Sequence, residues 1–229
     1  SEEVITGGLE DLDERCAEYQ ALGAKFTKWR AVIKIGDNMP SQECIDANMQ
    51  ALADYAQIVQ NNGMVPMVEP EVLMDGEHSA QTCFEVSENC LKTLFTCLEG
   101  NSVNLKGTIL KPNMILSGTN APLQANIQEV AELTVKVLKE NVPTDLAGIA
   151  FLSGGQSDFL ATAHLDAMNK MGEFPWELSF SYGRALQQPA LKAWMGQIDN
   201  VELAQKAFSH RALMNKLAAN GEWNEDLES

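Results

Sequence analysis

The sequence predicts an α/β protein built around a parallel sheet, and two patterns carry that prediction. Short β-branched runs alternate with longer amphipathic stretches along the 229 residues. The runs recur about every 40 residues, which is the length of a strand–helix unit because parallel strands need a crossover of that size. The runs are also continuously apolar, as expected for strands that are covered on both faces.

Five strands and four helices are predicted from these patterns. The strands cover residues 29–35, 64–68, 107–110, 148–152 and 178–181. The helices cover residues 41–63, about 79–98, 127–142 and 157–170. Ser41 is a suitable N-cap for the first helix, and Gly63 is its left-handed terminator. The third helix stops before Pro143 because the residue that precedes a proline disfavours helical geometry.

The chain is expected to form one domain over residues 1–229. No low-complexity linker divides it, and 45% hydrophobic residues suffice for a substantial core. The net charge of -16 argues against extended contact with nucleic acid, which needs a basic surface. No apolar run approaches the ~18 residues of a membrane span. We therefore expect a cytoplasmic protein with neither a nucleic-acid nor a membrane partner.

The cysteines and histidines indicate packing rather than a metal or redox site. The five cysteines form no C-x-x-C pair, which suits a reducing compartment. Cys83, Cys90 and Cys97 recur every seven residues, and we interpret them as core residues. The three histidines lie in separate segments without the spacing of a metal site. We expect no metal and no cofactor.

Polar residues accompany each predicted strand, mostly at its end. They are Lys28 and Arg30, Glu69 and Glu71, Lys111, then Ser153, Gly154 and Gly155, and finally Ser181, Gly183 and Arg184. Each has an ordinary explanation when taken alone, such as a snorkelling lysine, a solvated turn or a tight Gly-Gly turn. Together they favour a (β/α)₈ barrel over an open five-stranded sheet, because barrel active sites lie at the C-terminal ends of the strands.

A barrel needs eight strands, so five strand–helix units are expected to be part of one, with about three units missing. If the last two predicted strands are the seventh and eighth, the glycines of the Ser153-Gly154-Gly155 turn and Gly183 are placed to bind phosphate. Arg184 adds a bidentate donor for the same anion. A cationic pocket in an acidic protein suits a doubly anionic small substrate.

Lys111 is the candidate nucleophile of this site. It follows the apolar run 107–110, so its amine is expected beside apolar side chains and near other cations. Burial and like charge both lower the pKa of an amine, and a neutral amine is needed to form a Schiff base. Lys28 supplies the neighbouring charge. Glu69 is placed to exchange protons during imine formation, and Glu71 to orient Lys28 or Glu69.

The motifs that hold these residues resemble the signature segments of class I fructose-bisphosphate aldolases. In chain order they read F-T-K-W-R with V-I-K-I, M-V-E-P-E, L-K-P-N-M, F-L-S-G-G-Q-S, and F-S-Y-G-R-A-L with L-K-A-W. The resemblance extends from about Gly7 to Gly221. It implies the C-terminal part of a (β/α)₈ barrel.

The resemblance also implies a role for each site residue. Lys111 corresponds to the Schiff-base lysine, Glu69 to the acid/base, Glu71 to its partner, Lys28 to the electrostatic neighbour, and Arg30 to the C6-phosphate side. The C1-phosphate site corresponds to Ser153, Gly154, Ser181, Gly183 and Arg184. The implied enzyme is a metal-independent, commonly tetrameric lyase of glycolysis and gluconeogenesis. It cleaves fructose 1,6-bisphosphate reversibly into dihydroxyacetone phosphate and glyceraldehyde 3-phosphate.

The chain departs from the family pattern in two places. An aspartate of the first strand and a lysine of the third strand have no counterpart in it, and the last residue is Ser229 where the family has a tyrosine. Two alternatives therefore stay open. One is a Schiff-base aldolase for another sugar phosphate, and the other is a silent barrel fragment that serves as an interaction module.

Overall fold

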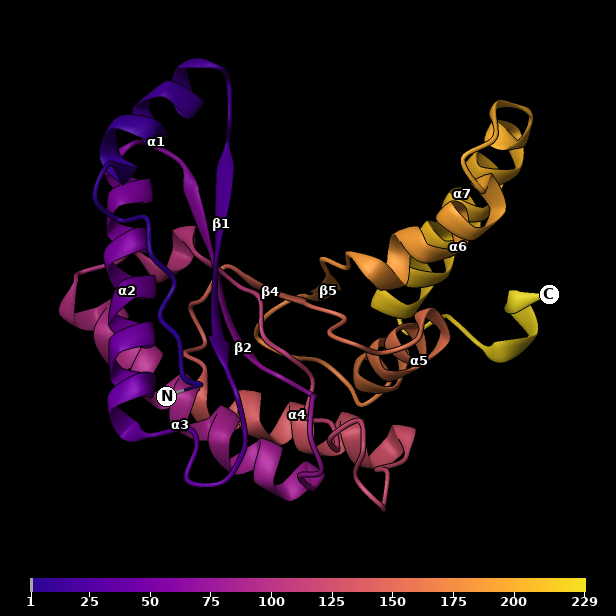
Figure 1. Ribbon diagram of the computed structural model, residues 1–229, viewed down its shortest axis with the longest axis horizontal. Coiled ribbons are helices and arrows are strands. Elements are labelled where there is room, and N and C mark those ends of the chain that lie inside the picture. The colour runs from indigo at the N-terminus through magenta and orange to yellow at the C-terminus, as the bar shows by residue number, and fades with distance from the viewer. Residues whose placement is uncertain (1) are drawn as a thin grey trace.

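The computed structural model describes residues 2–229 and confirms the predicted α/β class (Figure 1). Five strands form one parallel sheet in the order β1-β2-β3-β4-β5. They are β1 (Phe26–Ile33), β2 (Val65–Val72), β3 (Ile109–Leu110), β4 (Gly148–Phe151) and β5 (Leu178–Phe180). All five predicted strands are present, and they follow the chain order from one edge of the sheet to the other.

The first two strands differ from their predicted bounds because they pair with each other over eight residues, from Phe26↔Val65 to Ile33↔Val72. β2 therefore continues through Glu69, Pro70 and Glu71, which lie beyond the predicted end of this strand. Pro70 is tolerated in β2 because its missing backbone N–H would not face β1. The amides of Val65 and Leu73 bind β1 carbonyls, so alternate residues such as Pro70 face away from β1.

Four helices follow the strands as predicted. They are α2 (Gln42–Asn61), α3 (Ala80–Gly100), α4 (Ile127–Asn141) and α5 (Asp158–Asn169). The oxygens of Ser41, Ser79, Asn126 and Ser157 cap the four N-termini by accepting a backbone N–H two or three residues into the helix. Cys83 and Cys90 are buried in the core, as interpreted, whereas Cys97 is only half-buried.

Three helices are not among those predicted: α1 (Leu12–Ala21), α6 (Arg184–Trp194) and α7 (Val201–Ala219). Pro189 lies inside α6 and argues against a helix there. In α7 the buried stripe consists of Arg211, Met214, Asn215 and Ala218, so polar residues occupy positions where a sequence pattern needs apolar ones. Apolar periodicity therefore does not predict either helix.

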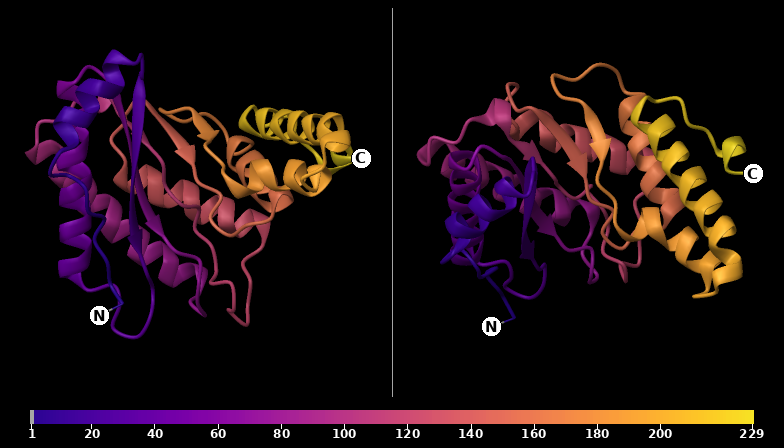
Figure 2. Two further views of the ribbon diagram at one scale, coloured as in Figure 1. Left: turned by 45° about the horizontal axis from the view of Figure 1, so that its top comes forward. Right: turned by 90° about the horizontal axis from the view of Figure 1, so that it is seen from above.

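Helices α2, α3, α4 and α5 contact one another in succession, so they cover the same side of the sheet. Figure 2 shows them wrapped around the strands, with α6 and α7 at the end of the molecule away from α1 and α2. A sheet wound in one direction, with all crossovers on one face, is the arrangement of a barrel rather than of a doubly wound open sheet. No helix among residues 2–229 is long and apolar enough to cross a membrane.

Candidate active site

Three of the predicted catalytic side chains meet on one face of the sheet. The Oε2 atom of Glu69 lies 3.0 Å from Lys28 Nζ, and its Oε1 atom lies 3.2 Å from Lys111 Nζ. The strand register explains this meeting: Met67 is paired with Ile109, so two residues further along β2 and β3 Glu69 comes beside Lys111. Lys28 reaches the same carboxylate from β1.

The burial of this cluster makes its charges mutually dependent. The side chain of Glu69 is 5% exposed and that of Lys111 is 12% exposed, whereas Lys28 keeps 40%. An isolated carboxylate at such a depth is strongly unfavourable, and two ammonium groups compensate it. The three groups carry one excess positive charge, which favours an anionic ligand at the open side of the sheet.

Glu71 has a different partner from the one expected. Its carboxylate accepts a hydrogen bond from Arg30 Nε, whereas the sequence suggested that it orients Lys28 or Glu69. Residues two apart on a strand share a face, so Arg30 and Glu71 form a second ion pair beside the first. This contact raises the pKa of the Arg30 guanidinium. Arg30 uses Nε in the pair, which leaves its two Nη groups for another anion.

The predicted phosphate-binding residues lie together where β4 and β5 end. Ser153 is buried, and Gly154 has a φ of 57°, a left-handed conformation that favours glycine. Arg184 Nη2 donates to Gly154 O over 2.8 Å. Ser181, half-buried, donates its backbone N–H to Phe151 O. These contacts bring the ends of β4 and β5 together beside the Arg184 guanidinium.

Gly183 and Arg184 open helix α6 instead of ending a strand. Gly183 is the N-cap residue, and Arg184 is the first residue of the helix. The first amides of a helix lack internal partners and attract anions. The position of these two residues therefore agrees with a phosphate site, although the sequence did not predict the helix.

Gly155 is engaged within the protein. Its backbone N–H donates to Met74 Sδ over 3.0 Å, and a Cβ at this position would lie 2.9 Å from the same sulfur. The amide is therefore directed at Met74 and not at the space beside Arg184. Gly154 contacts Arg184 through its carbonyl oxygen, and Gly155 borders a hollow that Arg184 also lines.

Two residues that sequence reasoning left without a role support this turn. Gln156 Nε2 donates to Ser153 O over 3.1 Å, and its Oε1 lies 2.6 Å from His164 Nδ1. Since the amide oxygen is an acceptor, the His164 nitrogen is the donor. Gln156 belongs to the quoted S-G-G-Q-S motif, which was an available signal. His164 lies eight residues further on, on the buried face of α5, and only the fold brings it there.

Asn113 ties the same edge of the sheet to α3. Its Oδ1 accepts the N–H of Val72, and its Nδ2 donates to Ser87 Oγ and to Met114 O. Met114 and Asn113 are buried, and the backbone N–H of Lys111 donates to Val68 O. The backbone of Lys111 is therefore bound to β2, and Asn113, two residues further on, is bound to α3 and to the residue at the end of β2.

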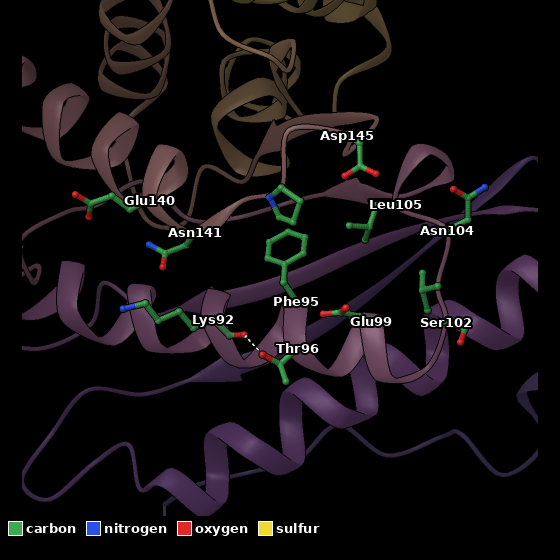
Figure 3. A pocket seen from close by; sticks show the side chains of 12 residues that line it. Lys92, Phe95, Thr96, Glu99, Ser102, Asn104, Leu105, Glu140, Asn141 and Asp145 are labelled. Carbon is green, nitrogen blue, oxygen red and sulfur yellow. Dashed lines mark hydrogen bonds between the residues drawn. The ribbon is translucent and has the colours of Figure 1, made fainter.

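A hollow between α3 and α4 lies elsewhere (Figure 3). It has a volume of about 720 Å³ and is bordered by the carboxylates of Glu99, Glu140 and Asp145 and by Lys92. Three carboxylates repel a phosphate, and none of the predicted site residues reaches this hollow. Within the part of the chain that the structure describes, no group of three or more metal-ligating side chains is present either. Independence of metal remains a prediction.

A one-directional parallel sheet with a buried lysine–carboxylate–lysine cluster places the chain in the (β/α) barrel class, and the comparisons agree. A family model described as fructose-bisphosphate aldolase class-I matches residues 1–229. A probable fructose-bisphosphate aldolase class 1 from Xanthomonas axonopodis pv. citri is 54% identical over 222 residues, or 96% of this chain and 66% of that protein. The chain belongs to the class I fructose-bisphosphate aldolase family.

Two further relatives support the family and the fold. A fructose-bisphosphate aldolase from Dictyostelium discoideum is 48% identical over 223 residues, which is 96% of this chain and 62% of that protein. An aldolase from Plasmodium falciparum, solved with TRAP and a small-molecule inhibitor, superimposes with a TM-score of 0.96 at 43% identity over 98% of this chain and 65% of that one. The chain therefore spans about two thirds of the length of such relatives.

Proposed function

We propose that the protein containing this chain is a lyase that reversibly cleaves fructose 1,6-bisphosphate into dihydroxyacetone phosphate and glyceraldehyde 3-phosphate. The observation that carries the proposal is the contact between Lys111 and Glu69, in which an amine with 12% exposure lies 3.2 Å from a buried carboxylate. A lysine that attacks a ketone needs a neighbouring group that takes its proton, and Glu69 has that position.

In the proposed reaction Glu69 removes a proton from the ammonium of Lys111, and the neutral amine attacks C2 of the ketose. The resulting carbinolamine loses water when Glu69 returns the proton to the leaving hydroxyl group. The protonated imine then accepts the electron pair of the C3–C4 bond, while the C4 hydroxyl group gives its proton to Glu69, which is a carboxylate again after the loss of water. Glyceraldehyde 3-phosphate leaves, and the enamine remains on Lys111 until protonation and hydrolysis release the second product.

The two substrate phosphates are assigned to opposite ends of the cluster. Arg30 lies on β1 beside Lys28 and is proposed to bind the C6-phosphate through its free Nη groups. The C1-phosphate is assigned to the donors at the ends of β4 and β5, namely Ser153, Gly154, Ser181, Gly183 and Arg184. Positive groups on both sides of Lys111 would hold the ketone across the amine.

Borohydride reduction in the presence of dihydroxyacetone phosphate, followed by peptide mapping, tests the assignment. The expected result is one stable adduct, on the peptide that contains Lys111. Lys111→Met keeps the length and apolar character of the side chain but removes the nitrogen, so the adduct should vanish and turnover should fall at least about a thousandfold. An adduct on another lysine, or none in the active wild-type protein, would overturn the proposal.

The remaining assignments concern the setting of the enzyme. We propose one barrel domain, with residues 1–229 as its C-terminal part, in a cytoplasmic homotetramer that acts in glycolysis. The support for the location is a relative, 47% identical over 227 residues, that is named cytosolic fructose-bisphosphate aldolase 4 of Arabidopsis thaliana. The tetramer rests on the family resemblance, and sedimentation equilibrium of the complete protein tests it.

A further inference from the structure

A second cavity adjoins the segment that follows Ser153 and Gly154, and Gly155, Gln156 and Ser157 form part of its wall. It has a volume of about 610 Å³ and opens between the segment after β3 and the first turns of α4 and α5. Its walls include the side chains of Met74, Leu116, Ile127, Val130 and Leu160. A cavity of this size with mostly apolar walls is typical of a small-molecule site, for which ~300–1,000 Å³ is the usual range.

Most polar groups of the cavity wall already have partners. The Gln156 amide donates to Ser153 O and accepts from His164 Nδ1. Asn126 accepts the N–H of Glu129 as the cap of α4. Gln124 donates to two carbonyls of its own loop, those of Gly118 and Ala121. Each of these side chains forms a hydrogen bond within the protein, and the remaining polar atoms of Gln124 and Asn126 belong to exposed residues that water reaches.

His164 is the exception. His164 lines the cavity, and only 3% of its surface is exposed. Nδ1 is the donor in the bond to Gln156, so Nε2 carries the lone pair, and no hydrogen bond to Nε2 is formed among residues 2–229. Burial lowers the pKa of His164 to about 4, so the ring is neutral at physiological pH. The Nε2 atom of this mostly buried ring therefore remains at the cavity wall as an acceptor without a partner in the protein.

We propose that this cavity binds a small aromatic or aliphatic molecule that carries one N–H or O–H group and donates it to His164 Nε2. The apolar walls would cover the body of the ligand, and the imidazole would select for the donor. An anion is excluded, because a neutral acceptor repels it and no cationic side chain lines the cavity. The cavity borders the turn of the proposed phosphate site through Gly155 and Gln156, but it contains neither Lys111 nor Glu69, and its test does not depend on activity.

Indole and 1-methylindole are a matched pair of probes, since they have nearly the same apolar surface and only indole has an N–H group. Binding is followed by nitrogen-detected NMR of the histidine rings. Indole should bind saturably, should shift the His164 Nε2 resonance, and should bind at least about fivefold more tightly than 1-methylindole because of one added hydrogen bond. Equal affinity for the two probes, or saturation without a His164 shift, would overturn the proposal.

Leu160→Trp provides a variant that fills the cavity and keeps His164. Leu160 is 40% exposed at the cavity wall, so the larger ring should be tolerated by the fold while it occupies the ligand volume. Leu203→Trp is the control, because Leu203 is 57% exposed on α7 and does not line this cavity. The first variant should lose at least about tenfold in indole affinity and the second should lose none. Wild-type affinity in Leu160→Trp would show that indole binds elsewhere.

Discussion

Glu69 holds two lysines at once, and at the scale of single residues this sharing decides how the charges of the site respond to substitution. Each carboxylate oxygen has its own ammonium partner, at 3.0 Å and 3.2 Å. If one lysine is lost, the buried carboxylate depends on the other alone. Loss of one partner should therefore strengthen the hold of Glu69 on the remaining lysine.

Lys28→Met should slow the reaction without preventing the covalent step. With Lys28 absent, Glu69 stabilises the charged form of Lys111, and less neutral amine is available for attack. We expect turnover to fall roughly a hundredfold, in the range of a lost electrostatic contact, while borohydride still labels Lys111. Lys25→Met is the control, since Lys25 is exposed just before β1. Loss of labelling in Lys28→Met would contradict this role.

His164 predicts a pH dependence of stability. Burial lowers its pKa from 6.5 to about 4, so below pH 6.5 the unfolded chain takes up a proton that the folded chain does not. The free energy of unfolding that depends on this ring is fully present above about pH 6.5 and is lost as the pH falls towards 4. The largest loss is on the order of 3 kcal/mol.

Urea denaturation at neutral pH and near pH 5 measures this effect in the wild type and in His164→Asn. The variant lacks the titrating ring, so the decrease in its unfolding free energy between the two pH values should be the smaller by about 1–2 kcal/mol. Identical decreases in both proteins would show that His164 is protonated as readily in the folded state as in the unfolded state.

At the scale of elements, two loops beyond the ends of β2 and β3 pack backbone against backbone. The amides of Gly118, Thr119 and Asn120 donate to the carbonyls of His78, Met74 and Gly76, respectively. A Cβ on Gly118 would lie 2.7 Å from the carbonyl carbon of Gly76 and 2.9 Å from the amide nitrogen of His78. Neither backbone atom can move aside as a flexible side chain can.

Gly118→Ala should therefore destabilise the fold by about 2–3 kcal/mol, the upper part of the range for an overpacked site. Gly7→Ala is a matched control, because a Cβ on Gly7 meets no atom within 4 Å. Urea denaturation of both variants against the wild type measures the difference. Equal urea midpoints for the two variants would mean that the two loops can separate at little cost in free energy. The loop that carries Met74 would then hold the Gly155 amide only weakly.

At the scale of the whole molecule, the sheet has two unpaired edges among the described strands, and helices α6 and α7 carry exposed apolar side chains. β1 and β5 each pair with a single neighbour among the described strands. Large apolar side chains on and between α6 and α7 are exposed, namely Leu191, Trp194, Met195, Ile198, Leu203 and Phe208. Figure 1 shows these two helices projecting from the body. Open strand edges and contiguous apolar surface both promote association.

The 229-residue chain alone should therefore self-associate at micromolar concentration or above, which sedimentation velocity would detect. Replacing Ile198 and Leu203 together by lysine should shift the chain towards the monomer. Leu123→Lys is the control, because Leu123 is 82% exposed in a loop outside α6 and α7. A wild-type chain that sediments as a monomer at every concentration would show that these apolar side chains need no cover.

The sequence by itself determined the parallel α/β class, the four helices with their capping residues, and the choice of Lys28, Glu69 and Lys111 as residues of one site. These features follow from local periodicity, from capping residues, and from motifs that place charged or polar side chains beside apolar strands. Lys111, Glu69 and Arg184 stood out because a charged residue beside an apolar run needs a reason.

The tertiary structure alone decided which charges pair and which amides are free. The pairing of Arg30 with Glu71 and the position of Glu69 between two lysines depend on strand register, which no single segment encodes. The contact of Gly155 with Met74 joins residues 81 positions apart. The polar stripe of α7 became buried only when α5 and α7 packed together, and His164 became buried beside Gln156 and the segment that leads into α4. Local sequence patterns report the surroundings of a residue along the chain, whereas these contacts arise from segments that meet only after folding.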